Sequence, residues 1–119
     1  MSKAGMMRIY IAGPITGTID YRDRFAAAKI YLENLGHRAI DPVKIASEMP
    51  FVGEWCYKQY IDNGLELLSE CDGIYMLSGW SESRGAVLEE NYAGTVGIAR
   101  YYQGHTEPLP NKPVHRDYY

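Results

Sequence analysis

The chain has 119 residues, which is long enough for one domain with its own core. Its net charge is −3 and it has no long basic run, which argues against binding to nucleic-acid polymers. A content of 46% hydrophobic and 23% charged residues is typical of a globular, soluble protein. No apolar run approaches the roughly 20 residues that cross a bilayer, and no secretory signal precedes the first predicted strand, so we expect a cytoplasmic protein without membrane contact.

The first strand is predicted at residues 7–12, followed by a loop rich in breakers at 13–18. A helix is expected over 21–35, with Asp20 as a natural N-cap and Gly36 as its stop. Residues 1–6 resemble a loose leader.

The remaining elements alternate between strands and helices. They are a strand at 37–40, an irregular stretch at 43–53, a helix at 54–69, a strand at 73–77, a helix at 83–96 and a last strand at 98–102. We therefore expect one domain over 1–103. Residues 104–119, which hold three prolines and few aliphatic side chains, are expected to form an extended or disordered tail.

This alternation predicts an α/β fold with a parallel sheet of four to five strands, flanked by helices on both faces. In the common strand order 2-1-3-4, ligands bind where the winding reverses, between strands one and three. The loops at 13–18 and 78–85 should meet there, and they are the two loops richest in Gly, Ser and Thr.

Glu89 is the most informative residue. Helical spacing places it on one face with Ala86, Ala93 and Val96, so its carboxylate should point toward the sheet and need a partner, a proton or a function. The alternative is a side chain that reaches the surface along the helix. Glu90, about 100° around the helix, is expected to face solvent.

The segment before this helix is a candidate anion site, because free backbone N–H groups and the helix dipole favour a phosphate there. Ser81 or Ser83 would either cap the helix or donate to the phosphate, and Arg84 would either pair with it or be a solvated charge. Gly85 would let a ligand approach the backbone. The chain has neither a Walker loop nor a GxGxxG fingerprint, so we expect no cofactor.

Asp62 lies in the predicted helix at 54–69, where Asp is unfavourable, and it is either a second acid near Glu89 or a surface residue paired with Lys58. The hydroxyl of Tyr10 could reach the site, and Trp80 could stack on a base. The cysteines Cys56 and Cys71 lack metal-ligand spacing, so we expect buried free thiols and no metal.

Two motifs together resemble the nucleoside 2-deoxyribosyltransferase superfamily. One is the strand and loop at 10–17, with the sequence YIAGPITG. The other is the Ser83-x-Gly85-x-x-x-Glu89 helix start. The stretch from Tyr10 to Gly97 is also similar to a compact phage and prophage family of uncharacterised proteins within that superfamily, and to the 2′-deoxynucleoside 5′-phosphate N-hydrolases.

The resemblance implies a flavodoxin-like or Rossmann-like fold, a homodimer or higher homo-oligomer, and cleavage of the N-glycosidic bond of a 2′-deoxynucleoside or its 5′-monophosphate by hydrolysis or base exchange. It implies that Glu89 attacks the anomeric carbon and that Asp62 protonates or positions the leaving base. It implies that Tyr10, Ser83 and Gly85 bind the substrate. Together with the first-loop residues Gly13, Pro14 and Ile15, and with Trp80 and Arg84 of the second loop, they are the expected substrate-binding residues.

An alternative is a nucleotide-binding protein, a sensor or sponge, that turns nothing over. The first loop has Thr16 where the nucleotide hydrolases carry Arg, which favours this alternative unless Arg22 or Arg24 supplies the charge. A structural protein that keeps the fold without a site is a third, weaker alternative.

Overall fold

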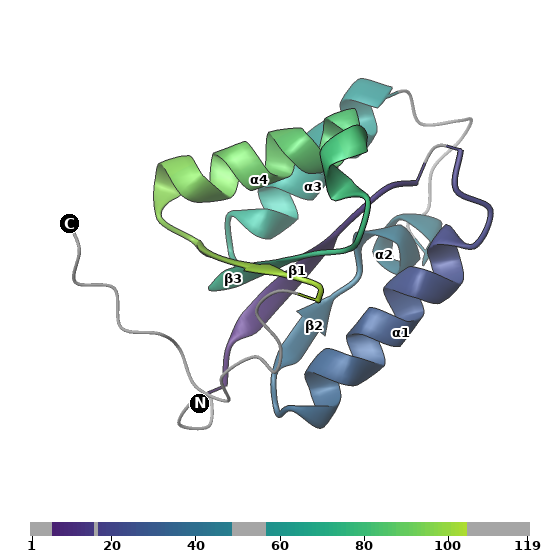
Figure 1. The fold of residues 1–119 in the computed structure, drawn as a ribbon. Coiled ribbons are helices and arrows are strands. Elements are labelled where there is room, and N and C mark those ends of the chain that lie inside the picture. Colours follow the sequence, from purple (N-terminus) through teal and green to yellow (C-terminus); the bar gives the residue numbers. More distant parts are fainter. Residues whose placement is uncertain (1–5, 16, 49–56, 105–119) are drawn as a thin grey trace.

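The computed structural model describes residues 6–15, 17–48 and 57–104, and in this part of the chain four parallel strands form one sheet in the order β2-β1-β3-β4 (Figure 1). The elements are β1 Arg8–Ala12, α1 Tyr21–Asn34, β2 Arg38–Ile40, α2 Pro42–Glu48, α3 Tyr57–Leu68, β3 Gly73–Met76, the 3-10 turn η1 Trp80–Glu82, α4 Arg84–Val96 and β4 Ala99–Tyr102. The predicted flavodoxin-like α/β fold and its strand order are confirmed. No helix in the described ranges combines the length and the apolar character that crossing a membrane requires.

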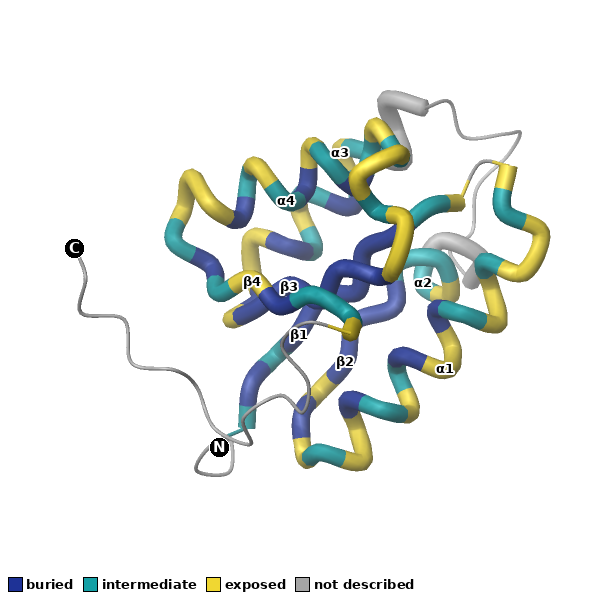
Figure 2. Tube along the Cα trace, in the orientation of Figure 1, coloured by how far each residue is buried: buried dark blue, intermediate teal, exposed yellow. Residues whose placement is uncertain are grey.

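The helices cover the two faces of the sheet and divide the core into two layers. In Figure 1, α1 lies on one side of the strands, and α3 and α4 lie on the other. Side chains alternate along β1, so that Ile9 and Ile11 pack with α1 while Tyr10 and Ala12 pack with α3 and α4. Figure 2 shows the strands as the most buried part of the fold and the outward sides of the helices as exposed.

Strand register places Tyr10 in the middle of the sheet. It lies between Ile40 of β2 and Ile74 of β3, two residues before the carboxyl end of β1. Its ring is 1% exposed. A polar hydroxyl at this depth needs a hydrogen-bond partner, because burying it unpaired costs about 1–3 kcal/mol.

Residues 43–48 of the stretch at 43–53, which was predicted to be irregular, lie in the helix α2, so that expectation was wrong for its described part; residues 49–53 lie outside the described residues. The cause is visible in the sequence. Asp41 is buried, and its carboxylate accepts hydrogen bonds from the backbone N–H groups of Val43 at 3.0 Å and Lys44 at 3.2 Å. Pro42 occupies the first helical position, where its missing N–H is not needed.

Two further details differ from the sequence-based expectation. Asp20 precedes α1, but its side chain makes no capping hydrogen bond. Val96 is 51% exposed rather than part of the inward face of α4, because the helix ends there and Gly97 turns the chain back toward β4. Thr16, Cys56 and the tail beyond Gly104 lie outside the described residues.

The contrast between the two aspartates gives a test. Asp41→Ala should lower the free energy of unfolding by about 1 kcal/mol, because two backbone donors of α2 lose their acceptor. Asp20→Ala should change it by much less. Urea denaturation of both variants beside the wild type measures this, and equal losses for the two would contradict the assignment of the caps.

Candidate active site

Glu89 lies on the inward face of α4, between Ala86 and Ala93. All three residues are buried, and Glu89 is 9% exposed. The two alanines are small enough for α4 to approach the sheet closely, which brings the glutamate side chain into the layer between the helix and β1. The carboxylate therefore points inward, and the alternative of a side chain reaching the surface is not realised.

The partner of Glu89 is Tyr10. The phenol hydroxyl donates a hydrogen bond to Oε2 of Glu89 at 2.5 Å, across 79 residues of sequence. No lysine or arginine in the described ranges forms an ion pair with this carboxylate. A carboxylate and a phenol from two different elements thus form a buried polar pair, and no cation of the described residues is ion-paired with it.

Burial dominates the electrostatics of the pair. It raises the pKa of Glu89 from 4.5 to about 7, because the charged form loses its water, and the hydrogen bond from Tyr10 acts in the opposite direction, lowering it. The pKa of Tyr10 is raised well above its ordinary value, first by burial and then by the negative charge of Glu89. Glu89 can therefore both hold and release a proton near neutral pH.

Gly64 of α3 covers this pair. A Cβ at position 64 would lie 2.6 Å from Glu89 Oε2 and 2.6 Å from the Tyr10 hydroxyl oxygen. Sequence reasoning did not single out Gly64. Its position inside a predicted helix could have identified it, because Gly lowers helix stability by about 1 kcal/mol relative to Ala and is usually kept there by close packing.

Asp62 is exposed on the same helix, two residues before Gly64. Two residues on an α-helix are about 200° apart, so the side of α3 that meets Glu89 carries Gly64 rather than Asp62. In this single chain the two predicted acids therefore point in different directions. The role of Asp62 stays a prediction.

The two loops predicted to meet at the carboxyl edge of the sheet do so. Gly13 is needed there, since a Cβ would lie 2.8 Å from Leu77 Cβ at the end of β3. Pro14 lies beside Gly79, at 3.5 Å from the position of a Cβ there. Arg24, partly buried in the first turn of α1, donates from Nη2 to the carbonyl oxygen of Ser78 at 2.7 Å. Ile15 is 39% exposed in the first loop.

At the start of α4, Ser83 is the N-cap, and its hydroxyl accepts from the backbone N–H of Ala86 at 3.3 Å. Arg84 is exposed. Gly85 allows α3 and α4 to pack closely, because a Cβ there would lie 3.1 Å from Ile61 Cδ1.

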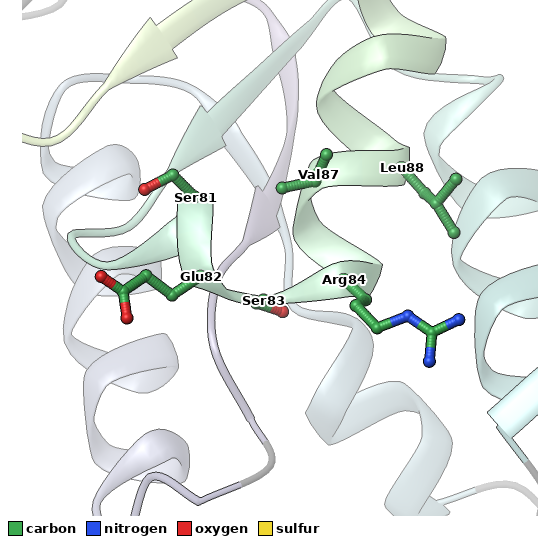
Figure 3. Close-up of a pocket in the computed structure, with 6 residues that line it drawn as sticks. All are labelled: Ser81, Glu82, Ser83, Arg84, Val87 and Leu88. Carbon is green, nitrogen blue, oxygen red and sulfur yellow. The ribbon is translucent and has the colours of Figure 1, made fainter.

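An open cavity of about 310 Å³ lies over this segment (Figure 3). Its lining residues are Ser81, Glu82, Ser83, Arg84, Val87 and Leu88. The cavity thus brings together three of the residues predicted for anion binding, Ser81, Ser83 and Arg84. Glu89 is not among its lining residues.

Glu90 does not face solvent as predicted. Its carboxylate accepts from the Tyr102 hydroxyl at 2.7 Å and pairs with Arg100 at 3.1 Å, and its side chain is 13% exposed. Trp80 is partly buried, and its ring lies 5.8 Å from that of Tyr102. These contacts join α4 and η1 to the edge strand β4, which explains why Glu90 is drawn inward.

Cys71 is a buried thiol whose pKa is raised to about 11 by burial, so it stays protonated and unreactive near neutral pH. Within the described ranges, no three His, Cys, Asp or Glu side chains cluster so as to hold a metal ion. The buried polar groups that meet at this site are the Glu89 carboxylate and the Tyr10 phenol.

The fold and the site define a flavodoxin-like α/β protein with a buried carboxylate behind the point where the strand order reverses. The chain belongs to the family described as "Domain of unknown function (DUF4406)", which matches residues 7–102. No curated protein matches this chain.

A solved structure with the same fold is a 2-deoxyribosyltransferase from the psychrotolerant bacterium Bacillus psychrosaccharolyticus. The TM-score is 0.64 at 19% sequence identity, over 80% of this chain and 70% of that one. That protein is described as a biocatalyst for the synthesis of antiviral and antitumoral nucleosides. At this level of identity the likeness shows the shared fold.

The raised pKa of Glu89 predicts how stability depends on pH. Between pH 4.5 and about 7 the native state holds a proton on Glu89 that the unfolded chain has released. The free energy of unfolding should therefore fall as pH rises through this window, by at most roughly 1.4 kcal/mol per pH unit from this group. The contribution is complete below pH 4.5 and lost above about 7.

Glu89→Gln should remove this part of the slope, because the amide oxygen still accepts from Tyr10 but does not titrate. Urea denaturation at a series of pH values tests this, with Glu66→Gln on the exposed side of α3 as the control for loss of a carboxylate. An unchanged slope in Glu89→Gln would show that the carboxylate is not proton-bound in the native state.

Proposed function

We propose that this protein cleaves the N-glycosidic bond of a 2′-deoxynucleoside or its 5′-monophosphate through a covalent glycosyl intermediate on Glu89. The observation that carries the proposal is the buried Glu89 carboxylate held by the Tyr10 hydroxyl at 2.5 Å. The shared fold with a solved 2-deoxyribosyltransferase agrees with it. The transition state of such a reaction resembles an oxocarbenium ion, which a carboxylate in a water-poor site stabilises.

In the first step, a carboxylate oxygen of Glu89 attacks the anomeric carbon, C1′, while the bond from C1′ to the base nitrogen breaks. The electron pair of that bond leaves with the base, which takes up a proton. In the second step, water or the nitrogen of another base attacks C1′ and releases the carboxylate, with loss of one proton from the attacking molecule. Water yields hydrolysis, and a second base yields exchange.

Tyr10 orients Glu89 in this proposal, because its hydrogen bond holds Oε2 and leaves the second carboxylate oxygen for attack. Asp62 is the proposed proton donor to the leaving base. Its exposed position on α3 means that it must reach the substrate from outside the buried pair.

Substrate binding is proposed for the residues around the two loops, which are Gly13, Pro14, Ile15, Trp80, Ser83, Arg84 and Gly85. Arg24 supports a phosphate-bearing substrate, since it places a positive charge beside Ser78, where the loops meet. This charge lies at the carboxyl edge of the sheet, although the first loop itself carries no arginine.

Access to the carboxylate is a requirement of the mechanism. A reacting carbon must come within roughly 3.5 Å of the attacking oxygen, and Glu89 is 9% exposed. Substrate binding must therefore widen the space beside Glu89, on the side toward the loops at the carboxyl edge of the sheet.

A second candidate function is nucleotide binding without turnover. The cavity at the start of α4 favours it, because Ser83 and Arg84 line that cavity and Glu89 does not. A sensor or sponge could hold a phosphate there without using the carboxylate.

A panel of 2′-deoxynucleosides and their 5′-monophosphates, with and without an acceptor base, tests the enzyme proposal. Chromatography should detect base release or exchange in the wild type. The rate should fall at least roughly 1,000-fold in Glu89→Gln, which keeps the shape of the side chain but not the nucleophile. Asp62→Asn should lose roughly 100-fold if it is the acid. Nucleotide-induced thermal stabilisation without release from any substrate would instead support the binding protein.

The pH dependence of turnover is a second test. Attack requires the ionised carboxylate, so the acid limb of the kcat/KM profile should rise about tenfold per pH unit and end near pH 7. In Tyr10→Phe the inflection should move to higher pH, because the hydrogen bond that lowers the pKa of Glu89 is gone. An inflection that does not move in this variant would contradict the assigned role of the phenol.

A further inference from the structure

Gly64 is in close contact with both members of the buried pair, the Glu89 carboxylate and the Tyr10 hydroxyl. A Cβ at this position would lie 2.6 Å from Glu89 Oε2 and from the Tyr10 hydroxyl oxygen, closer than real Cβ atoms approach an oxygen. Both side chains are buried, so neither has solvent into which it can swing. Any residue other than glycine must therefore displace the pair or the helix.

Backbone conformation does not explain the glycine at 64. The glycines of the described residues that have a positive φ are Gly17, Gly36, Gly79, Gly97 and Gly104. Gly64 instead lies inside the helix α3, where glycine is unfavourable relative to alanine. The close contact with Glu89 and Tyr10 is what requires it.

Gly94 of α4 is the useful comparison. A Cβ there would lie 2.8 Å from Nη1 of Arg100, which is also too close. Arg100 is exposed, however, and the far end of its flexible side chain can move. A Cβ at Gly64 or at Gly94 would thus meet another side chain too closely, but of these two glycines only Gly64 is in contact with buried side chains.

A second glycine contact fixes the same two helices against each other. Ile61 of α3 lies against Gly85 of α4, and Gly64 of α3 lies against Glu89 of α4. The spacings of three residues on α3 and four on α4 place both contacts along one line between the helices. Each helix contributes one glycine to this line of contacts, and the contact at Gly64 is the closer of the two.

We propose that Gly64 is a positioning residue for the Glu89 nucleophile: the absence of a side chain at this point lets α3 lie directly on the Glu89–Tyr10 pair and hold the carboxylate in one orientation. Three elements then fix Oε2, namely β1 through the Tyr10 hydroxyl, α3 through Gly64, and α4 through the backbone of Glu89 itself. The catalytic part of this inference rests on the proposed function, whereas the structural part does not.

The test compares Gly64→Ala with Gly94→Ala, since both exchanges add the same methyl group and the same gain in helix propensity. In Gly64→Ala the displaced helix should admit water, and the pKa of Glu89, followed by carbon NMR of the labelled carboxyl group, should move down toward its ordinary value. If the enzyme turns over, kcat should fall roughly 100-fold with KM little changed, as for a misplaced reacting group. Gly94→Ala should leave the pKa of Glu89 and kcat unchanged.

Thermal unfolding supplies a readout that is independent of activity. Alanine at 64 should lower Tm strongly in the wild type and much less in the backgrounds Tyr10→Phe and Glu89→Ala, because each of these removes one of the two atoms that the new Cβ meets. If Gly64→Ala does not fold, these backgrounds should restore folding.

The proposal is overturned if alanine at 64 has the same effect on Tm in all three backgrounds, or if it leaves the pKa of Glu89 where it is in the wild type. A wild type that releases no base, combined with the expected pKa and Tm results, would refute the proposed function while leaving the position of Gly64 over the pair established.

Discussion

The Glu89 carboxylate is removed from water by three elements at once, and the hydrogen bond from Tyr10 is what stabilises it there. The surrounding residues are small for this reason: Ala86 and Ala93 let α4 approach the sheet, and Gly64 lets α3 close over the side chain. Because no cation of the described residues neutralises the charge, burial brings the pKa of Glu89 to about 7. A group in this state is costly for stability and useful for chemistry.

The position of this carboxylate also orders the rest of the proposed site. Tyr10 lies two residues below the carboxyl end of β1, so Glu89 sits beneath the edge at which the two glycine-rich loops meet. At that edge, Arg24 of α1 reaches the loop after β3 and Ser83 begins α4. A ligand with its sugar toward Glu89 would therefore have its remaining groups directed toward the loops, where Arg24 and the start of α4 lie.

Sequence patterns predicted the helices on both faces and the inward direction of Glu89, because these follow from short-range periodicity. The strand order was predicted as the common one for this alternation of strands and helices. Sequence patterns failed where a contact joins residues distant in sequence. Glu90 was predicted to be solvated, but Tyr102 and Arg100 of β4 draw it inward. Gly64 of α3, which meets Glu89, was missed for the same reason, and the role of Asp62 on that helix stays a prediction. The helix α2 was missed because Asp41-Pro42 was taken only as the end of a strand, although the pair also caps and starts a helix.

The most direct test of the central claim is to trap the glycosyl intermediate. A 2′-fluoro-substituted deoxynucleoside slows both steps, since fluorine disfavours an oxocarbenium-like transition state, and it slows release of the sugar enough for the adduct to accumulate. Intact-mass spectrometry followed by peptide mapping should then find one fluorinated sugar on the peptide that contains Glu89, and none in Glu89→Gln. Base release without any adduct on Glu89, or an adduct on another residue, would contradict the account.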